Sequence, residues 1–406
     1  MTAALFELPE PEPADAGRAD PGADREVTFL HTADWQLGMT RHFLAGDAQH
    51  TYDAARADAV VAVGRLARST GAEFVVVCGD VFDDARVSSR IIRRTLDALG
   101  DYGVPVYLLP GNHDPLDATS VYRGDTFVRA RPDNVHVLDR AGVVRVRDGV
   151  TLVAAPWTSK RPEHDLITEQ LGRLAPGDDL RIVVGHGGVD TFSPGTDPAI
   201  VASADLQTAV DTALVDYVAL GDRHSVTPIG DSQRIWYSGA PEVTDFDHVE
   251  ADSGQVLEVT LRRGASSAVE VTPHRVGQWT FTTIRQDVNG AADLDVLRER
   301  LTALPDRSRT VVKLALVGTV GLGDEAVLSE LLDEFSERLA ALQIWERHHD
   351  LTVVADPSDV AGLGLQGYAA EAAGELAELT ASTDDAEAAA ARSALSLLFR
   401  LTGAHG

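Results

Sequence analysis

Short apolar runs that end in polar clusters alternate with stretches of helical spacing through the first part of this chain. The run VTFLHT predicts a first strand, and apolar residues at helical spacing from Tyr52 to Ser69 predict a first helix. EFVVVC and VPVYLL repeat the strand pattern, and residues 88–99 predict a second helix between them. Strands that alternate with helices indicate an α/β core.

The middle of the chain is richer in strands. They are predicted from VHVL, GVVRVRD, VTLVAAPW, RIVVGHGG, VDYVALGDRH and RIWYSGAP. The pattern fades near Pro273, and a second β-α-β-α-β order follows, with its helices at residues 292–304 and 324–343. We therefore expect these segments along the chain: a flexible tail at 1–25, a large α/β domain at 26–275, a small α/β domain at 276–356, and a C-terminal segment at 357–406 with a linker at 362–367 and helices at 368–379 and 384–402.

The start of the chain and its single cysteine bear on where the protein works. The first 25 residues are acidic and rich in proline, unlike a secretory signal, and no apolar run approaches the roughly 18 residues that a membrane span needs. Cys78 stands alone, which excludes an intrachain disulfide and a cysteine-based zinc site. We expect a cytoplasmic protein that does not enter a membrane.

Five of the predicted strands end in loops whose side chains can bind metal ions. The segments are FLHTADWQ, VVVCGDVFDD, LLPGNHD, VVGHGG and VALGDRH, and their candidate residues are Asp34, Gln36, Asp80, Asn112, His113, His186, Asp222 and His224. Sites in open α/β sheets form beyond the carboxyl ends of the strands, where five such loops would converge. A single GD or GH is most often turn chemistry, but five such loops in this order favour a metal site.

These loops resemble the motifs of calcineurin-type metallophosphoesterases, which are D-x-H, GD-x-x-D, GNH[DE], GH and GH-x-H. More narrowly, GDVFD, PVYLLPGNHD and the later WYSGAPEVTDFDH resemble SbcD-type nuclease subunits of the double-strand-break repair complex. The resemblance extends over about residues 27–250, is weaker for the small domain and does not cover the first 25 residues. It implies a catalytic domain of two mixed sheets between helices, with the small α/β domain as its cap.

The resemblance also implies roles for the candidate residues. Asp80 would bridge two divalent metal ions, which we expect to be manganese. The remaining ligands would fall into one set for each ion: Asp34, Gln36 and His224 in the first, and Asn112, His186 and Asp222 in the second. His113 would bind no metal and would protonate the leaving alkoxide or stabilise the phosphate. Two ions about 3.5–4 Å apart offset the charge of a phosphodiester and activate water.

Two residues depart from the family pattern, because Gln36 and Asp222 stand where the family has histidine. Gln36 can bind a metal only through its amide oxygen, and Asp222 adds a negative charge. A degraded site would more often carry alanine, glycine or bulky apolar residues at these positions. Since both replacements keep an oxygen ligand, we favour a site with altered metal preference over an inactive site.

The net charge of −28, from 35 basic and 63 acidic residues, argues against nucleic-acid binding. Bound cations would supply local positive charge, however. The resemblance implies a metal-dependent DNA nuclease, acting as exonuclease or endonuclease in DNA repair, that forms a homodimer and has an SbcC-type ATPase partner. The C-terminal helices would dock that partner or pack on the cap. Two alternatives stay open: a phosphodiesterase or phosphatase for small molecules, nucleotides or proteins, and a non-catalytic repair scaffold.

Overall fold

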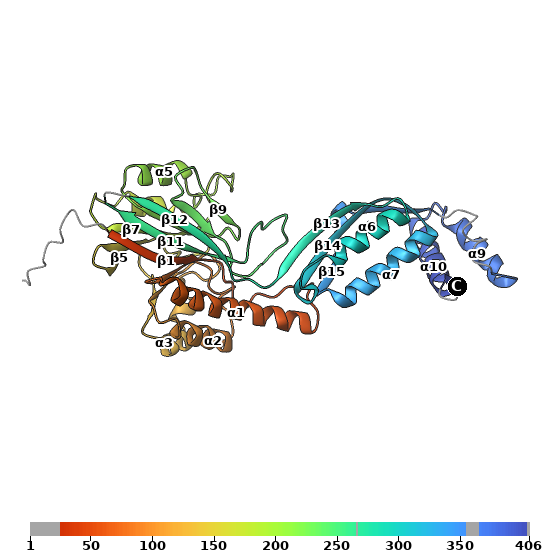
Figure 1. Cartoon of the computed structure of the whole chain (residues 1–406), viewed down its shortest axis with the longest axis horizontal. Coiled ribbons are helices and arrows are strands. Elements are labelled where there is room, and N and C mark those ends of the chain that lie inside the picture. Colours follow the sequence, from red (N-terminus) through yellow and green to blue (C-terminus); the bar gives the residue numbers. More distant parts are fainter. Residues whose placement is uncertain (1–24, 265–266, 355–364, 404–406) are drawn as a thin grey trace, which may run out of the picture.

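The computed structural model describes residues 25–264, 267–354 and 365–403. Figure 1 shows an elongated arrangement, with two large sheets at one end, a smaller sheet next to them, and the C-terminal helices at the other end. The predicted tail, apart from Arg25, lies outside the described residues, as does the first half of the predicted linker.

The first large sheet has six strands in the order β12-β11-β1-β2-β3-β4. Its strands are β1 (Arg25–Thr32), β2 (Val75–Cys78), β3 (Val106–Leu109), β4 (Val135–Val137), β11 (Gln255–Arg263) and β12 (Ala268–Arg275). Strands β1 to β4 run parallel, while β11 is antiparallel to both β1 and β12. One face is covered by α1 (Asp47–Thr70), α2 (Ser89–Gly100) and α3 (Asp125–Ala130), with the short 3-10 helix η1 (Val121–Arg123) before α3.

The second large sheet also has six strands, in the order β5-β6-β7-β8-β10-β9. Its strands are β5 (Gly142–Arg147), β6 (Val150–Ala154), β7 (Leu180–His186), β8 (Tyr217–Gly221), β9 (Val226–Pro228) and β10 (Ile235–Ser238). Helices α4 (Leu166–Leu171) and α5 (Ser203–Asp211) cover its outer face. Its inner face packs on the first sheet, where Phe29 and Val76 meet Leu152 and Ile182 in one buried cluster. This is the predicted sandwich of two mixed sheets between helices.

The third sheet has four parallel strands and follows the sandwich along the chain. Its elements are β13 (Thr280–Asp287), α6 (Ala291–Thr302), η2 (Arg307–Arg309), β14 (Thr310–Gly321), α7 (Leu322–Arg338), β15 (Ala341–Ile344), η3 (Glu346–His348) and β16 (Asp350–Val354). Strand β14 pairs with the other three. Leu297 of α6 and Phe335 of α7 are fully buried in one cluster with Leu314 of the sheet. The small α/β unit expected after the sandwich is therefore present, and we call this sheet and its helices the cap.

Two details of the predicted elements were wrong. The predicted helix at 324–343 ends at Arg338, because Ala340 turns back to hydrogen-bond near β14 and residues 341–344 form β15. Strands β11 and β12 were not predicted. The sequence pattern of the large domain was expected to end near Pro273, but no strand was assigned to the residues before it. Pro273 lies inside β12, which tolerates it as an edge strand that needs no second ladder of hydrogen bonds.

The last two helices are α9 (Tyr368–Leu379) and α10 (Asp385–Gly403). Leu322 of α7, Ala373 of α9 and Leu395 of α10 form one small buried cluster. The sequence left two possibilities for these helices, docking of a partner or packing on the cap. The structure shows that they pack on the cap. Within the described part of the chain, no helix combines the length and apolar character needed to cross a membrane.

The packing of α1 generates a stability prediction. A Cβ at Gly64 would lie 2.4 Å from the ring of Tyr102, whose hydroxyl donates to the Val60 carbonyl at 2.5 Å. We expect Gly64→Ala to lower the free energy of unfolding by about 1–3 kcal/mol, because this clash outweighs the helix preference of alanine of about 1 kcal/mol. Gly374→Ala in α9, where no atom lies within 4 Å of the new Cβ, is the control and should not destabilise the protein. Urea unfolding followed by circular dichroism measures both, and an unchanged midpoint for Gly64→Ala would contradict the packing argument.

Candidate metal centre

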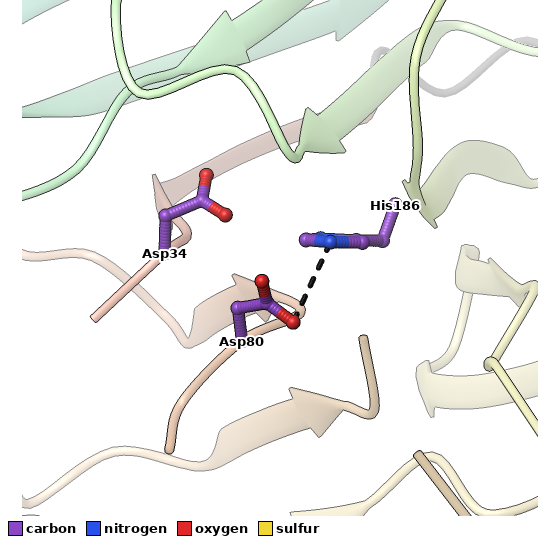
Figure 2. A group of neighbouring side chains, drawn as sticks. All are labelled: Asp34, Asp80 and His186. Carbon is purple, nitrogen blue, oxygen red and sulfur yellow. Dashed lines mark ion pairs between the residues drawn. The ribbon is translucent and has the colours of Figure 1, made fainter. Parts of the chain in front are cut away.

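The predicted metal-binding loops meet where the two large sheets face each other. Asp34 and Asp80 follow β1 and β2, and His186 is the last residue of β7. Figure 2 shows these three side chains pointing toward one another from three different strands. One ligand atom from each lies within 4.8 Å of the others, and all three residues are buried. Residues more than 150 positions apart are thus brought into one buried cluster.

One group of candidate ligands surrounds His186. Its Nε2 atom lies 2.7 Å from Asn112 Oδ1, 3.5 Å from Asp80 Oδ1 and 3.8 Å from Asp222 Oδ1. Its Nδ1 atom lies 2.8 Å from the Cys78 carbonyl, so Nδ1 carries the proton and donates it there. The lone pair of Nε2 then faces three oxygens, an arrangement that a bound cation or a second proton would stabilise.

A second group surrounds His224. Its Nε2 atom lies 3.2 Å from Gln36 Nε2 and 4.0 Å from Asp34 Oδ1. Gln36 Oε1 is buried and has no hydrogen-bond partner among the described residues. An unpartnered buried amide oxygen is unfavourable unless an ion or water completes it. Divalent cations are bound by such oxygens together with carboxylates and imidazoles, so the donor set fits a metal ion.

The backbone around these ligands is unusual. Asp34, Gln36, Asp80 and Asp222 all have positive φ, at 55°, 41°, 54° and 98°, in the left-handed region that glycine favours. Such conformations cost of order 1–3 kcal/mol each and cluster at functional sites. The turns are held by backbone bonds from Asp34 N to Gly79 O and from Gln36 N to Asp80 O, at 3.1 and 2.8 Å. The sharp turns place the side chains inside the sandwich, close to one another.

The centre concentrates negative charge away from water. Asp34 and Asp80 are 0% and 2% exposed. Burial raises the pKa of Asp34 to about 7, against the opposing effect of His224 and His186. Although burial of His186 disfavours its charged form, the carboxylates of Asp80, Asp34 and Asp222 raise its pKa to about 9. A site that raises the pKa of both an acid and a base in this way is short of positive charge, which bound cations would supply.

Two glycines are required for the loops to come this close. A Cβ at Gly111 would lie 2.2 Å from Asp80 Oδ1, and a Cβ at Gly221 would lie 1.9 Å from the Cys78 carbonyl. Both glycines immediately precede a candidate ligand, Asn112 or Asp222. The glycines of the GN and GD motifs therefore serve the packing of one loop against another.

His113 lies next to these groups without entering either of them. Its backbone N–H donates to Asp80 Oδ1 at 2.9 Å, while its Nε2 atom is 4.0 Å from Asp80 Oδ2. Its Nδ1 atom donates to the backbone carbonyl of Asp83 at 2.7 Å, which orients the ring. The side chain is 42% exposed. His113 can therefore reach a molecule that approaches the centre from solvent.

Three supporting residues were not among the predicted site residues. Asp114, the last residue of GNHD, accepts from Gly111 N at 2.8 Å and from Phe82 N at 3.1 Å, and so joins two ligand loops. Its place in the motif was a signal for it. Glu250 accepts from His224 Nδ1 at 2.6 Å, and Thr244 Oγ1 lies 2.7 Å from the same nitrogen. Neither Glu250 nor Thr244 belongs to a metal-binding motif, so only the fold reveals them.

A cavity of about 310 Å³ opens beside His224. It is lined by Arg41, Asp222, Arg223, His224, Ser225, Thr244, Asp245, Val249 and Glu250. Arg41 Nε is buried and finds no partner in the described ranges. Arg223 lies over the ring of Phe192, 4.4 Å from its centroid, and donates to Thr227 Oγ1 at 2.9 Å. Two arginines therefore line a cavity next to a centre that is rich in carboxylates.

Sequence comparisons with known proteins agree with this chemistry. Residues 27–226 match the model of the calcineurin-like phosphoesterase family. The SbcD subunit of the SbcCD nuclease from Rhodobacter capsulatus is 27% identical over 384 residues, covering 82% of this chain and 91% of the relative. Its counterpart in Escherichia coli K12 is 26% identical over 283 residues, covering 60% of this chain and 67% of the relative. Among solved structures, a dimetal phosphatase from Danio rerio covers 60% of this chain and 98% of its own, with 14% identity and a TM-score of 0.35.

The buried Asp-Asp-His cluster and the match over residues 27–226 support the same chemistry. The chain is a metal-dependent phosphoesterase, and the resemblance found in its sequence motifs is confirmed. Residues 27–226 match the calcineurin-like phosphoesterase family, and the chain is similar in sequence to the SbcD subunits of SbcCD nucleases.

Proposed function

We propose that this protein is a two-metal DNA nuclease of the SbcD type that acts in DNA repair. The observation that carries the proposal is the alignment with the Rhodobacter capsulatus nuclease subunit, which covers 91% of that relative. Because it covers 82% of this chain, it extends well beyond the phosphoesterase domain at 27–226. A small-molecule phosphatase would need to resemble this nuclease subunit only in the catalytic domain.

The two ligand groups support a centre for two divalent metal ions, which we propose to be manganese. Asp80 lies between the groups and is the proposed bridge. We divide the other proposed ligands by their distances to the two histidines. Asp34 and Gln36 lie near His224 and form one group with it, and Asn112 and Asp222 lie near His186 and form the other. When bound, the ions offset the charge of the phosphodiester and activate water.

The chain's own side chains handle the substrate in this proposal. We propose that Arg41 and Arg223, which line the cavity beside His224, contact phosphates of the substrate. His113, held by Asp83 and open to solvent, donates a proton to the leaving oxygen or stabilises the phosphate. The intact ligand set disfavours the non-catalytic scaffold.

We further propose that the protein works as a homodimer with an SbcC-type ATPase. The relatives are named as subunits of a nuclease, SbcCD, which supports a partner for this chain. On α9 and α10, Tyr368, Leu397 and Leu401 are 85%, 48% and 62% exposed. These apolar side chains support docking of the ATPase on the C-terminal helices, on a part of them that does not face the cap.

Cleavage assays with manganese test the proposed function directly. The substrates are single-stranded, double-stranded and hairpin DNA, next to a small phosphodiester ester, and Asp80→Ala is the inactive control. We expect DNA cleavage by the native protein and its loss, by more than about 100-fold, in Asp80→Ala, because the proposed bridging ligand is gone. Hydrolysis of the small ester without cleavage of any DNA would instead establish the small-molecule phosphodiesterase.

The geometry of His113 predicts that turnover and metal binding respond differently to its loss. His113→Ala should reduce turnover by about 10²–10⁴-fold, the usual worth of a general acid. Manganese affinity, measured by titration calorimetry, should stay at the native value, because His113 belongs to neither proposed ligand group: its Nδ1 is bonded to the Asp83 carbonyl and its Nε2 is 4.0 Å from Asp80 Oδ2. If His113→Ala loses a metal ion, His113 is a ligand and the proposed role is wrong.

The oxygen ligands Gln36 and Asp222 predict which metals the protein prefers. Imidazole suits zinc and iron, while carboxylate and amide oxygens suit manganese and magnesium. We expect manganese to support more activity than zinc or iron, and Gln36→His with Asp222→His to shift this preference toward zinc and iron. Activity across a panel of metals, for the native protein and the double variant, measures the shift. A native preference for zinc, or an unchanged preference in the double variant, would show that these replacements do not tune the site.

A further inference from the structure

One loop between β10 and β11, residues Glu242–Glu250, carries three carboxylates that contact three different parts of the molecule. The first, Glu242, is only 2% exposed. Its Oε2 accepts from Gln278 N at 2.8 Å and its Oε1 accepts from Trp279 N at 3.1 Å. Both partners lie on the segment that leads from the sandwich into β13 of the cap. We call residues Glu242–Glu250 the clamp loop.

The second carboxylate binds the cap sheet itself. Asp247 Oδ1 accepts from the backbone N–H of Thr283 at 3.0 Å and from its hydroxyl at 2.7 Å, and Oδ2 accepts from the Thr282 hydroxyl at 2.6 Å. The Asp247 N–H donates to the Phe281 carbonyl at 3.0 Å. Four hydrogen bonds therefore connect one residue of the clamp loop to the first half of β13.

The third carboxylate holds a proposed metal ligand. Glu250 Oε1 accepts from His224 Nδ1 at 2.6 Å, and its Oε2 accepts from Thr244 N at 2.9 Å. The proton is thereby placed on Nδ1, and Nε2 is directed toward Gln36 and Asp34. Carboxylates that orient a metal-binding histidine in this way raise its basicity and fix its ring.

Backbone hydrogen bonds close the clamp loop between these contacts. The Phe246 carbonyl accepts from Val249 N at 2.8 Å and from Glu250 N at 2.9 Å, so residues 246–250 form one closed turn. The Phe246 ring packs against Phe281 of the cap, with centroids 5.7 Å apart. Lys313 of β14 lies 4.6 Å from the centroid of the same ring. A shift of β13 would therefore move Glu250 together with Asp247.

We propose that the clamp loop positions His224 according to the placement of the cap, with Asp247 and Glu250 as its positioning residues. The inference rests on the proposed role of His224 as a metal ligand. The site is complete only while β13 is docked on Asp247, so a substrate that moves the cap also changes the metal centre. Linkage requires the reverse as well: metal binding must stabilise the joint between the cap and the sandwich.

Two threonines of β13, which bond to Asp247, allow the coupling between the cap and His224 to be tested from the cap side. Thr282→Val with Thr283→Val removes both hydroxyl donors to Asp247. The net charge and the sequence of the clamp loop stay unchanged. We expect manganese affinity, measured by titration calorimetry, to fall about 3- to 10-fold, the net worth of about one hydrogen bond. Glu250→Gln, which contacts His224 directly, should lower it about 10–100-fold.

Matched variants separate coupling from general damage. Thr282→Ser with Thr283→Ser keeps both hydroxyls and should restore native affinity. Thr319→Val makes the same change at an exposed position of β14 that pairs with β16, and should leave affinity unchanged. A native affinity in the valine pair would overturn the inference while leaving the proposed function intact. No manganese binding by the native protein would overturn the proposed function, and this inference with it.

Hydrogen exchange provides a second readout that does not depend on activity. The backbone amides of Gln278, Trp279 and Thr283 are the ones that donate to the clamp loop. Manganese should slow their exchange in the native protein by a factor comparable to the affinity lost in the valine pair. The slowing should be smaller in Glu250→Gln. Equal exchange with and without manganese in the native protein would show that the cap and the metal centre are independent.

Discussion

The burial of two neighbouring carboxylates, Asp34 and Asp80, between the large sheets is the constraint on which the rest of this structure depends. Charged groups that are removed from water destabilise a fold unless opposite charge accompanies them. The molecule meets this requirement with His186 and His224, which face the carboxylates, and with a geometry that suits cations. The left-handed turns at four candidate ligands accompany this burial, because they bring the loops that carry these side chains close together.

The acidic character of the chain is consistent with a phosphoesterase whose positive charge comes from bound ions. A net charge of −28 would repel an anionic substrate at long range. Near the centre the balance changes, since Arg41 and Arg223 line the adjacent cavity. In the proposed nuclease, the metal ions and these two arginines hold the phosphodiester locally. In the same proposal, Gln36 and Asp222 shift the site toward metals that favour oxygen ligands.

The clamp loop connects the centre to the cap through contacts that differ in kind. Glu242 and Asp247 accept hydrogen bonds from the cap side, while Glu250 accepts from a proposed ligand. Aromatic packing of Phe246 on Phe281 fills the space between them. A cap that only screened substrates would need no such connection to His224. In the proposed coupling, the clamp loop joins the placement of the cap to the geometry of the metal centre in one short segment.

The sequence by itself determined the α/β sandwich and the loops that carry the chemistry, because each loop follows a buried strand whose apolar run is visible in the chain. It could not show that residues 341–344 leave α7 to form β15, since their apolar spacing continues that of the helix and only pairing with β14 favours a strand. The resemblance had already divided the candidate ligands into two sets, but the distances within each set and the support of His224 by Glu250 were decided by the tertiary structure. Local sequence reports local periodicity, whereas these contacts join residues such as Gln36 and His224, which come together only when the two sheets pack.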